Sequence, residues 1–309
     1  MPKTETKKKG RAEKDVLLGA HVSAAGGPLK ALERALQIGC TAMQIFVKGN
    51  TRWEFPPLDS AEAQEFCRRR SESAINKAFA HSIYLVNLAT SDPLLRKKSI
   101  EDMIDELQRC EALGLEFLVV HPGSHGGAGS EAGIKCVAKA LDEIYERLPD
   151  CQCKICLETT AGQGSALGAD FRELNEIIER VASSRRLGIC LDTAHVFAAG
   201  YDIRTPEGYV QLWEDFDRFL GRDRLCALHL NDSKAPCGSR VDRHEHIGKG
   251  QIGTTGFRFF MQDKRLRGIP MVIETPKGPD MKEDVENLAV LRSLVSREAN
   301  RCSQSVTKR

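Results

Sequence analysis

The chain has 309 residues, of which 41% are hydrophobic and 28% are charged, and its formal net charge is +2 at pH 7. These values are typical of a globular protein with a sizeable core, and they exclude a mainly disordered body. Because the sequence has no apolar run of about eighteen residues and no apolar leader at its start, it predicts neither a membrane span nor a secretory signal. We therefore expect an intracellular protein, nuclear or mitochondrial in a eukaryote and cytoplasmic in a bacterium.

The beginning of the chain is basic. Residues 1–14 include six Lys and Arg residues and two Glu residues, a charge run that is typical of a solvated, disordered segment. We therefore predict a flexible basic tail over 1–15, one folded domain over 16–297 and a second flexible tail over 298–309. The tail is compatible with nonspecific affinity for nucleic acid, with a nuclear address, and with neither role.

Short apolar runs alternate with longer amphipathic stretches eight times along the domain. The runs predict strands at 17–21, 42–47, 79–81, 117–121, 155–158, 188–192, 226–229 and 271–274. The stretches predict helices that include 28–38, 93–113, 132–147, 171–181, 206–220 and 283–296. Eight repeats of strand and helix predict an α/β fold of the (β/α)8 TIM barrel type. A doubly wound sheet is the alternative, but residues 24–27 lack the complete glycine fingerprint of such sheets.

Seven of the eight predicted strands end on a side chain that can bind a metal. These residues are His21, His81, His121, Glu158, Asp192, His229 and Glu274. With 8 His and 43 Asp and Glu residues in the chain, chance would place only one or two of them there. The carboxyl ends of barrel strands meet at one mouth, where such groups need cations to neutralise them. Nitrogen and oxygen donors without thiolate favour Zn²⁺, with Mn²⁺ or iron as alternatives.

Eleven cysteines are scattered along apolar segments, for example Cys156, Cys190 and Cys226. This odd count and setting indicate reduced core thiols rather than a disulfide framework or a metal cluster.

Short motifs extend the predicted metal site. His195 follows Asp192 by three residues, which is close to one helical turn, so it can reach a neighbouring metal. Asn231 and Asp232 follow His229 and are expected to hydrogen-bond to ligands rather than to bind the metal.

Asp242 and His244 lie two residues apart in a segment that is predicted to belong to a long loop. Their side chains share a face if this segment is extended.

These residues resemble the endonuclease IV family, the metal-dependent apurinic/apyrimidinic endonucleases of base-excision repair. The similarity runs from about Leu18 to about Leu291. It is carried by GAHVSAAGG at 19–27, HPGSH at 121–125, TAGQGS at 160–165 and FAAGYD at 197–202. Matches that are this long and this dispersed are specific to the family.

The resemblance implies three zinc ions per chain, with Mn²⁺ as a substitute, and it fills every ligand position. The first ion is assigned to His81, His121 and Glu158, the second to Glu158, Asp192, His229 and Glu274, and the third to His195, Asp242 and His244. Glu158 and Glu274 are the residues that we assign as catalytic. A hydroxide that bridges the metals is the implied nucleophile.

The implied reaction is hydrolysis of the phosphodiester bond 5′ to an abasic site, which leaves a 3′-hydroxyl and a 5′-deoxyribose phosphate. Related enzymes also clear blocked 3′ ends. The implied partner is double-stranded DNA that carries either lesion, bound by a monomer without a membrane. Tyr84 and Leu85 match residues that related enzymes use to distort DNA. Without the resemblance, core packing would be the expected role of this pair.

Three positions depart from the family pattern. Thr51 stands where related enzymes often have an arginine that enters the base stack, and we assign this DNA contact to Arg52 instead. Ser82 follows His81 where Asp is frequent, and Thr159 follows Glu158 where Asn is frequent.

Two other functions are alternatives to the nuclease. A sugar isomerase or epimerase of the xylose-isomerase-like barrel group shares ligands at strand ends, but it needs one or two metals and has no use for His195, Asp242 and His244. A non-catalytic protein that recognises damaged DNA would contain structural metals, which normally have closed coordination.

Overall fold

The computed structural model describes residues 16–295. The tails predicted at 1–15 and 298–309 lie outside the described residues, as does the last part of the predicted 16–297 domain. All elements below belong to this described part.

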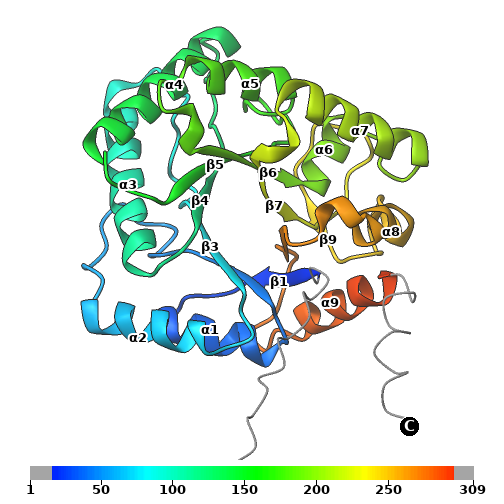
Figure 1. The fold of residues 1–309 in the computed structure, drawn as a ribbon. Coiled ribbons are helices and arrows are strands. Elements are labelled where there is room, and N and C mark those ends of the chain that lie inside the picture. Colours follow the sequence, from blue (N-terminus) through cyan, green and yellow to red (C-terminus); the bar gives the residue numbers. More distant parts are fainter. Residues whose placement is uncertain (1–15, 296–309) are drawn as a thin grey trace, which may run out of the picture.

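Within residues 16–295, eight parallel strands close a barrel, and helices form a ring around it (Figure 1). The strands are β1 (Leu17–His21), β2 (Ala42–Ile45), β3 (Lys77–His81), β4 (Phe117–Val120), β5 (Lys154–Glu158), β6 (Leu187–Asp192), β7 (Leu225–His229) and β10 (Pro270–Ile273). Their order around the barrel is β1-β10-β7-β6-β5-β4-β3-β2, with β2 pairing to β1. The predicted (β/α)8 barrel is confirmed.

The helices that cover the barrel are α1 (Pro28–Gln37), α2 (Ser60–Ser71), α3 (Pro93–Ala112), α4 (Ser130–Arg147), α5 (Phe171–Arg180), α6 (Thr193–Ala199), α7 (Pro206–Phe219), α8 (Gly253–Gln262) and α9 (Lys282–Leu294). Short 3₁₀ turns occur at Ser184–Arg186, Arg222–Arg224 and Lys264–Leu266. Helices α2, α6 and α8 were not among the predicted ones. Helix α2 buries just Ala63 and Phe66, so its hydrophobic periodicity is weak, while α6 is short and almost wholly buried.

Inward-facing side chains fill the barrel below its mouth. They form a cluster of Ala42, Phe79, Phe117, Val119, Cys156, Cys190, Ala227 and Val272. The rings of Phe79 and Phe117 stack at 4.6 Å between centroids. Outward-facing strand residues pack against the helices in a second, larger cluster. The barrel is therefore a packed core rather than a pore.

Several predicted strand boundaries were wrong. Strand β2 ends at Ile45 rather than at 47, and β3 begins at Lys77 rather than at 79. Strands β4 and β10 end one residue early, so His121 and Glu274 lie just beyond their strands. The reason is that the last backbone pairings of these strands join Val120 to Leu157 and Ile273 to Ala20, after which the chain turns into loops.

The segment that was predicted as a long loop after β7 contains two short antiparallel strands. Strand β8 (Asp232–Ser233) pairs with β9 (His244–Glu245), and the pairing places Ser233 opposite His244. This pairing matters for the site because β9 gives His244 a fixed backbone position.

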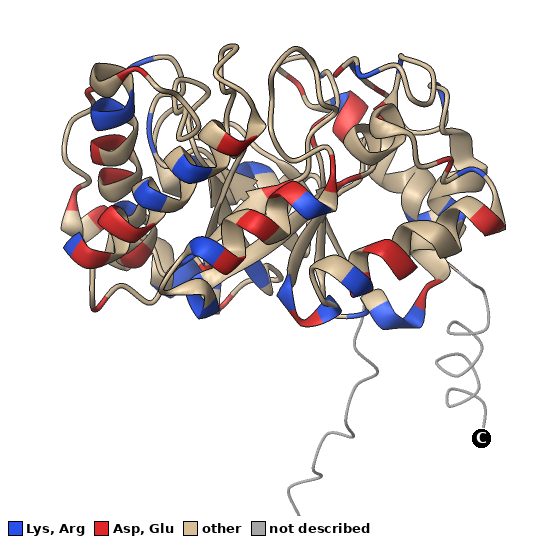
Figure 2. Ribbon diagram, turned by 90° about the horizontal axis from the view of Figure 1, so that it is seen from above, with Lys and Arg blue, Asp and Glu red and all other residues tan. Residues whose placement is uncertain are grey.

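Acidic and basic residues are interspersed over the outer helices (Figure 2). On α2, for example, Glu65 accepts hydrogen bonds from Arg68 and Arg69. The ten cysteines of the described residues are free, which agrees with the expected reduced thiols. No helix of this part of the chain is long and apolar enough to cross a membrane.

Candidate metal centre

A simple rule of strand geometry explains why the candidate ligands face one another. Side chains alternate across a strand, so a residue two positions after an inward-facing one also faces inward. Six candidate ligands each follow an inward-facing apolar residue by two positions. The apolar residues are Phe79, Val119, Cys156, Cys190, Ala227 and Val272, and the ligands in the same order are His81, His121, Glu158, Asp192, His229 and Glu274. The six side chains that the strands supply therefore form one layer above the packed interior.

The donor atoms of this layer and of the neighbouring loop gather into three groups that could each hold a metal ion. In the first group, Glu158 Oε2 lies 3.0 Å from His81 Nε2 and 3.2 Å from His121 Nε2. His81 and Glu158 are buried, whereas the His121 side chain is 41% exposed. This group therefore opens towards solvent through His121.

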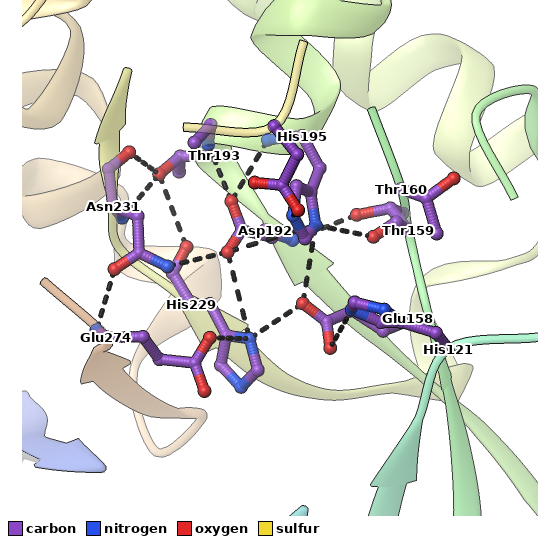
Figure 3. Close-up of polar contacts among 12 residues, drawn as sticks. His121, Glu158, Thr159, Thr160, Asp192, Thr193, His195, His229, Asn231 and Glu274 are labelled. Atoms are coloured by element: carbon purple, nitrogen blue, oxygen red, sulfur yellow. Dashed lines mark hydrogen bonds and ion pairs between the residues drawn. The ribbon is translucent and has the colours of Figure 1, made fainter. Parts of the chain in front are cut away.

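The second group surrounds Nδ1 of the buried His229. Three carboxylate oxygens approach this nitrogen, at 2.9 Å from Glu158, 3.3 Å from Glu274 and 3.8 Å from Asp192. The two oxygens of Glu158 serve different groups, because Oε2 faces His81 and His121 while Oε1 faces His229. Figure 3 shows Glu158 between His121 and His229. Glu158 is thus placed to bridge two cations.

The third group joins α6 to β9. It contains Asp192, His195 and His244. Asp242 lies between the two imidazoles, with one oxygen 3.2 Å from His195 Nε2 and the other 3.3 Å from His244 Nε2. The buried Nε2 atom of His244 has no hydrogen-bond partner among the described residues. This nitrogen, beside two carboxylates and a second imidazole, fits a metal ion of the zinc type.

Burial and charge perturb the protonation of these groups strongly. Burial alone would raise the pKa of Glu158, but the imidazoles of His229 and His121 hold it well below its usual range. Burial alone would lower the pKa of His244, but Asp192 and Asp242 raise it to about 9. Without a cation, the imidazole of His244 therefore takes up a proton beside these carboxylates, and a bound metal would replace that proton.

Asp192 supports the site from two sides. Its Oδ1 caps helix α6 by accepting from the backbone N–H groups of Ala194 (2.7 Å) and His195 (3.0 Å). Its Oδ2 accepts from Asn231 Nδ2 at 2.6 Å, and Asn231 Oδ1 accepts from the Glu274 N–H at 2.7 Å. Asn231 therefore links two candidate ligands, as its position after His229 led us to expect.

Asp232, in contrast, does not contact the candidate ligands as expected. Its carboxylate accepts from the backbone N–H groups of Gly248, Gly250, Ile252 and Gly253. Asp232 therefore holds the loop that leads into α8.

Backbone carbonyls orient two of the histidines. His81 Nδ1 lies 2.7 Å from the Ser82 carbonyl oxygen, and His195 Nδ1 lies 2.7 Å from the Thr159 carbonyl oxygen. These contacts leave Nε2 of each ring for the ligand position. Because backbone atoms make the contacts, the departures from the family pattern at Ser82 and Thr159 leave them intact.

Sequence reasoning missed one polar residue in this layer. Gln44 is completely buried, and its side-chain amide contacts His21, His229 and Glu274. The rule of two positions would have found it, because Ala42 faces inward. The prediction that the second strand continues to 47 placed the strand end too far along the chain.

The site opens into a cavity of about 350 Å³. Its lining includes His21, Tyr84, His121, Arg243 and Lys277. Arg243 and Lys277 are the two basic side chains in this lining, beside carboxylates and imidazoles, and they suit a substrate that carries negative charge.

The residues predicted to contact DNA lie on loops at the barrel mouth. Tyr84 is 70% exposed, and its ring lies 5.3 Å from that of Phe46, edge to face. Leu85 is half-buried, while Thr51 and Arg52 are exposed. Arg52 does not line the cavity of the candidate ligands but a separate hollow beside α3. Tyr84 is therefore close to the candidate ligands, and Arg52 belongs to the periphery.

Helix α3 anchors both of these loops. The buried Lys48 ammonium lies 2.5 Å from Asp102 and 3.0 Å from Asp105, and it also donates to the carbonyl of Trp53. One turn further along the helix, Glu106 accepts from the N–H of Ile83 at 3.1 Å. The loop of Arg52 and the loop of Tyr84 are thus fastened to one helix.

Comparison with known proteins identifies relatives over almost the whole barrel. The model of the family described as xylose isomerase-like TIM barrel matches residues 32–294. A protein named probable endonuclease 4 from Chloroflexus aurantiacus is 48% identical over 277 residues, which are 90% of this chain and 97% of that protein. A protein of the same name from Trichlorobacter lovleyi is 47% identical, over 90% of this chain and 99% of the relative.

Solved structures give the same result. Endonuclease IV from Thermus thermophilus has a TM-score of 0.78 and 38% identity, and the match covers 90% of this chain and 98% of that one. A D-tagatose 3-epimerase-like protein also matches, with a TM-score of 0.68 over 94% of this chain, but at 20% identity. At that identity the similarity indicates a shared fold.

Proposed function

Because the chain belongs to the endonuclease 4 family, we propose that it is a DNA repair hydrolase that cuts the phosphodiester bond 5′ to abasic sites with three zinc ions. The proposed products are a 3′-hydroxyl and a 5′-deoxyribose phosphate, and the proposed substrates include blocked 3′ ends. The observation that carries the proposal is the convergence of nine His, Asp and Glu side chains into three adjacent donor groups at one barrel mouth.

The proposed ligand sets follow the groups seen in the site. His81, His121 and Glu158 would hold the first ion, and Glu158, Asp192, His229 and Glu274 would hold the second. His195, Asp242 and His244 would hold the third, with Asp192 close by. When bound, the ions would activate water and neutralise the charge that develops on the phosphate.

We assign the catalytic roles to Glu158 and Glu274. Glu158 faces two donor groups at once, so its position would fix the spacing of two ions. Glu274 lies at the cavity wall, next to His229, where the scissile phosphate would enter. A fully buried aspartate, Asp192, accepts hydrogen bonds from α6 and from Asn231, so this part of the site is rigid before substrate binds.

The exposed ring of Tyr84 supports a role in DNA distortion. A nucleotide without its base costs less stacking energy to extrude, so a wedge at this position would favour abasic sites. We propose that Tyr84 and Leu85 provide this wedge, and that Arg52 contacts the duplex further from the cut. The proposed partner is therefore duplex DNA, bound by a single copy of the chain.

The test is an incision assay with a duplex that contains one tetrahydrofuran abasic analogue. The metal-loaded protein should nick that strand 5′ to the lesion, and a polymerase should extend the product because it ends in a 3′-hydroxyl. The undamaged duplex and the Glu158→Gln variant serve as controls. Binding without nicking would instead support a non-catalytic damage-recognition protein, and turnover of ketoses without nicking would support an epimerase.

A further inference from the structure

Strand β2 supplies none of the nine proposed ligands, yet it places a polar side chain among them. Gln44 lies two positions after the inward-facing Ala42 and pairs in register with His21 of β1 and Phe79 of β3. It is completely buried in the barrel. A buried carboxamide that lacked partners would be strongly destabilising, so its hydrogen bonds indicate what it does.

Both ends of the Gln44 amide contact the site. The oxygen Oε1 lies 2.8 Å from His229 Nε2. The nitrogen Nε2 lies 2.5 Å from Glu274 Oε1 and 2.7 Å from His21 Nδ1. A carboxylate can only accept, so the amide nitrogen must be the end that faces Glu274. The oxygen then faces His229, which must donate from Nε2.

This arrangement determines what the other nitrogen of His229 can do. With the ring proton on Nε2, the lone pair of a neutral imidazole lies on Nδ1. Nδ1 is the atom that Glu158, Glu274 and Asp192 surround. Three acceptors and one lone pair that face a common point need positive charge between them, which a proton supplies in the empty site and a metal ion would supply in the loaded one.

We propose that Gln44 is a positioning residue of the metal centre, which fixes the His229 ring with its proton on Nε2 and holds Glu274 beside it. The inference rests on the proposed function, because it concerns the ligands of the second ion. It adds to the site a residue from β2, a strand that the proposed ligand sets do not use. Gln44 also fixes His21, whose Nδ1 accepts from the amide and whose Nε2 therefore carries the proton.

The test measures zinc affinity in full-length Gln44→Met, which preserves the side-chain length and removes both hydrogen-bonding atoms. Loss of a group that orients a ligand typically weakens metal binding by about 10- to 100-fold. We expect a loss of about that size for one of the bound ions, measured by competition with a chromophoric chelator, while the other ions keep their affinity. The matched control is Gln262→Met, the same exchange on the exposed surface of α8, which should bind zinc as the unsubstituted chain does.

A second measurement needs no variant, so it can overturn the proposal even if Gln44→Met does not fold. The ¹⁵N spectrum of the histidine rings in the zinc-loaded, unsubstituted chain should show His229 protonated on Nε2. A proton on Nδ1 would overturn the proposal, as would a folded Gln44→Met variant whose affinities match those of the control. With either of these overturning results, an unsubstituted chain that still binds zinc and nicks abasic DNA would keep the proposed function, and only the role of Gln44 would be rejected.

Discussion

Replacement of His244 by alanine should separate one metal position from the other two. His244 belongs to a single donor group, in which its Nε2 lies 3.3 Å from Asp242 and 3.7 Å from Asp192. Glu158, in contrast, belongs to two groups. The structure therefore predicts that bound zinc falls from three ions to two in His244→Ala, and from three towards one in Glu158→Ala.

The expected loss of activity follows from the role of the third ion. A preorganised group that stabilises transition-state charge is typically worth about 100- to 1000-fold in rate, or about 3–4 kcal/mol. We expect a loss of this size in the single-turnover incision rate of His244→Ala. Mass spectrometry of the dialysed protein counts the metals, and gel analysis of a cut abasic duplex gives the rate.

The control for this experiment is His246→Ala. His246 is two residues further along, and its ring contacts Asn287 rather than the donor groups. This variant should retain three ions and the full rate. The reasoning would be refuted if the unsubstituted chain held one ion, or if His244→Ala still held three.

Three further predictions concern DNA affinity, the pH dependence of stability, and the loss of stability when zinc is removed. Tyr84→Ala should weaken binding to an abasic duplex by about 1–3 kcal/mol, the usual value of an aromatic stack on a base, and should leave bound zinc unchanged. Fluorescence anisotropy measures the affinity for the duplex, and an unchanged affinity would contradict the prediction. Burial raises the pKa of Glu106 well above 4.5, so the folded chain keeps a proton that the unfolded chain releases. Relative to Glu106→Gln, the unfolding free energy of the unsubstituted chain should therefore fall by about 1.4 kcal/mol per pH unit as the pH rises from about 4.5 to the folded-state pKa. Urea titrations at several pH values measure this free energy, and equal changes in both proteins would refute the prediction. Removal of zinc should lower the unfolding free energy by about 2.7 kcal/mol for each ion that was present at about 100 times its Kd. Calorimetry with and without chelator measures this difference, and equal stability in the two samples would show that the ions do not bind the folded chain.

The barrel could be predicted well from the sequence because the pattern of a short apolar run followed by an amphipathic stretch occurs eight times. Each strand is a short apolar run, and the alternation of side chains carries residues such as Glu158 and Asp192 to the inner face whether or not the strand end is located correctly. The mouth of a barrel then brings strand ends together. An error of one residue in the length of β4 did not move His121 out of the site.

The remaining part of the site depends on contacts that no local pattern encodes. Asp242 meets His195 because a loop after β7 folds back over α6, and the pairing of β8 with β9 fixes that loop. The family resemblance named both residues, but spacing alone did not bring them together. The opposite roles of Asn231 and Asp232, which are adjacent in sequence, likewise follow from alternation after the strand rather than from residue type.

The closure of the barrel has a consequence for the newly made chain. Among residues 16–295, β10 is the last strand to be synthesised, Glu274 follows it, and this strand joins β1 to β7. Until β10 takes its place, the second proposed ligand set is one carboxylate short and the wall of the cavity is open. A chain that stops before Glu274 therefore cannot assemble the complete proposed site, so the proposed cutting of DNA has to wait until β10 has closed the barrel.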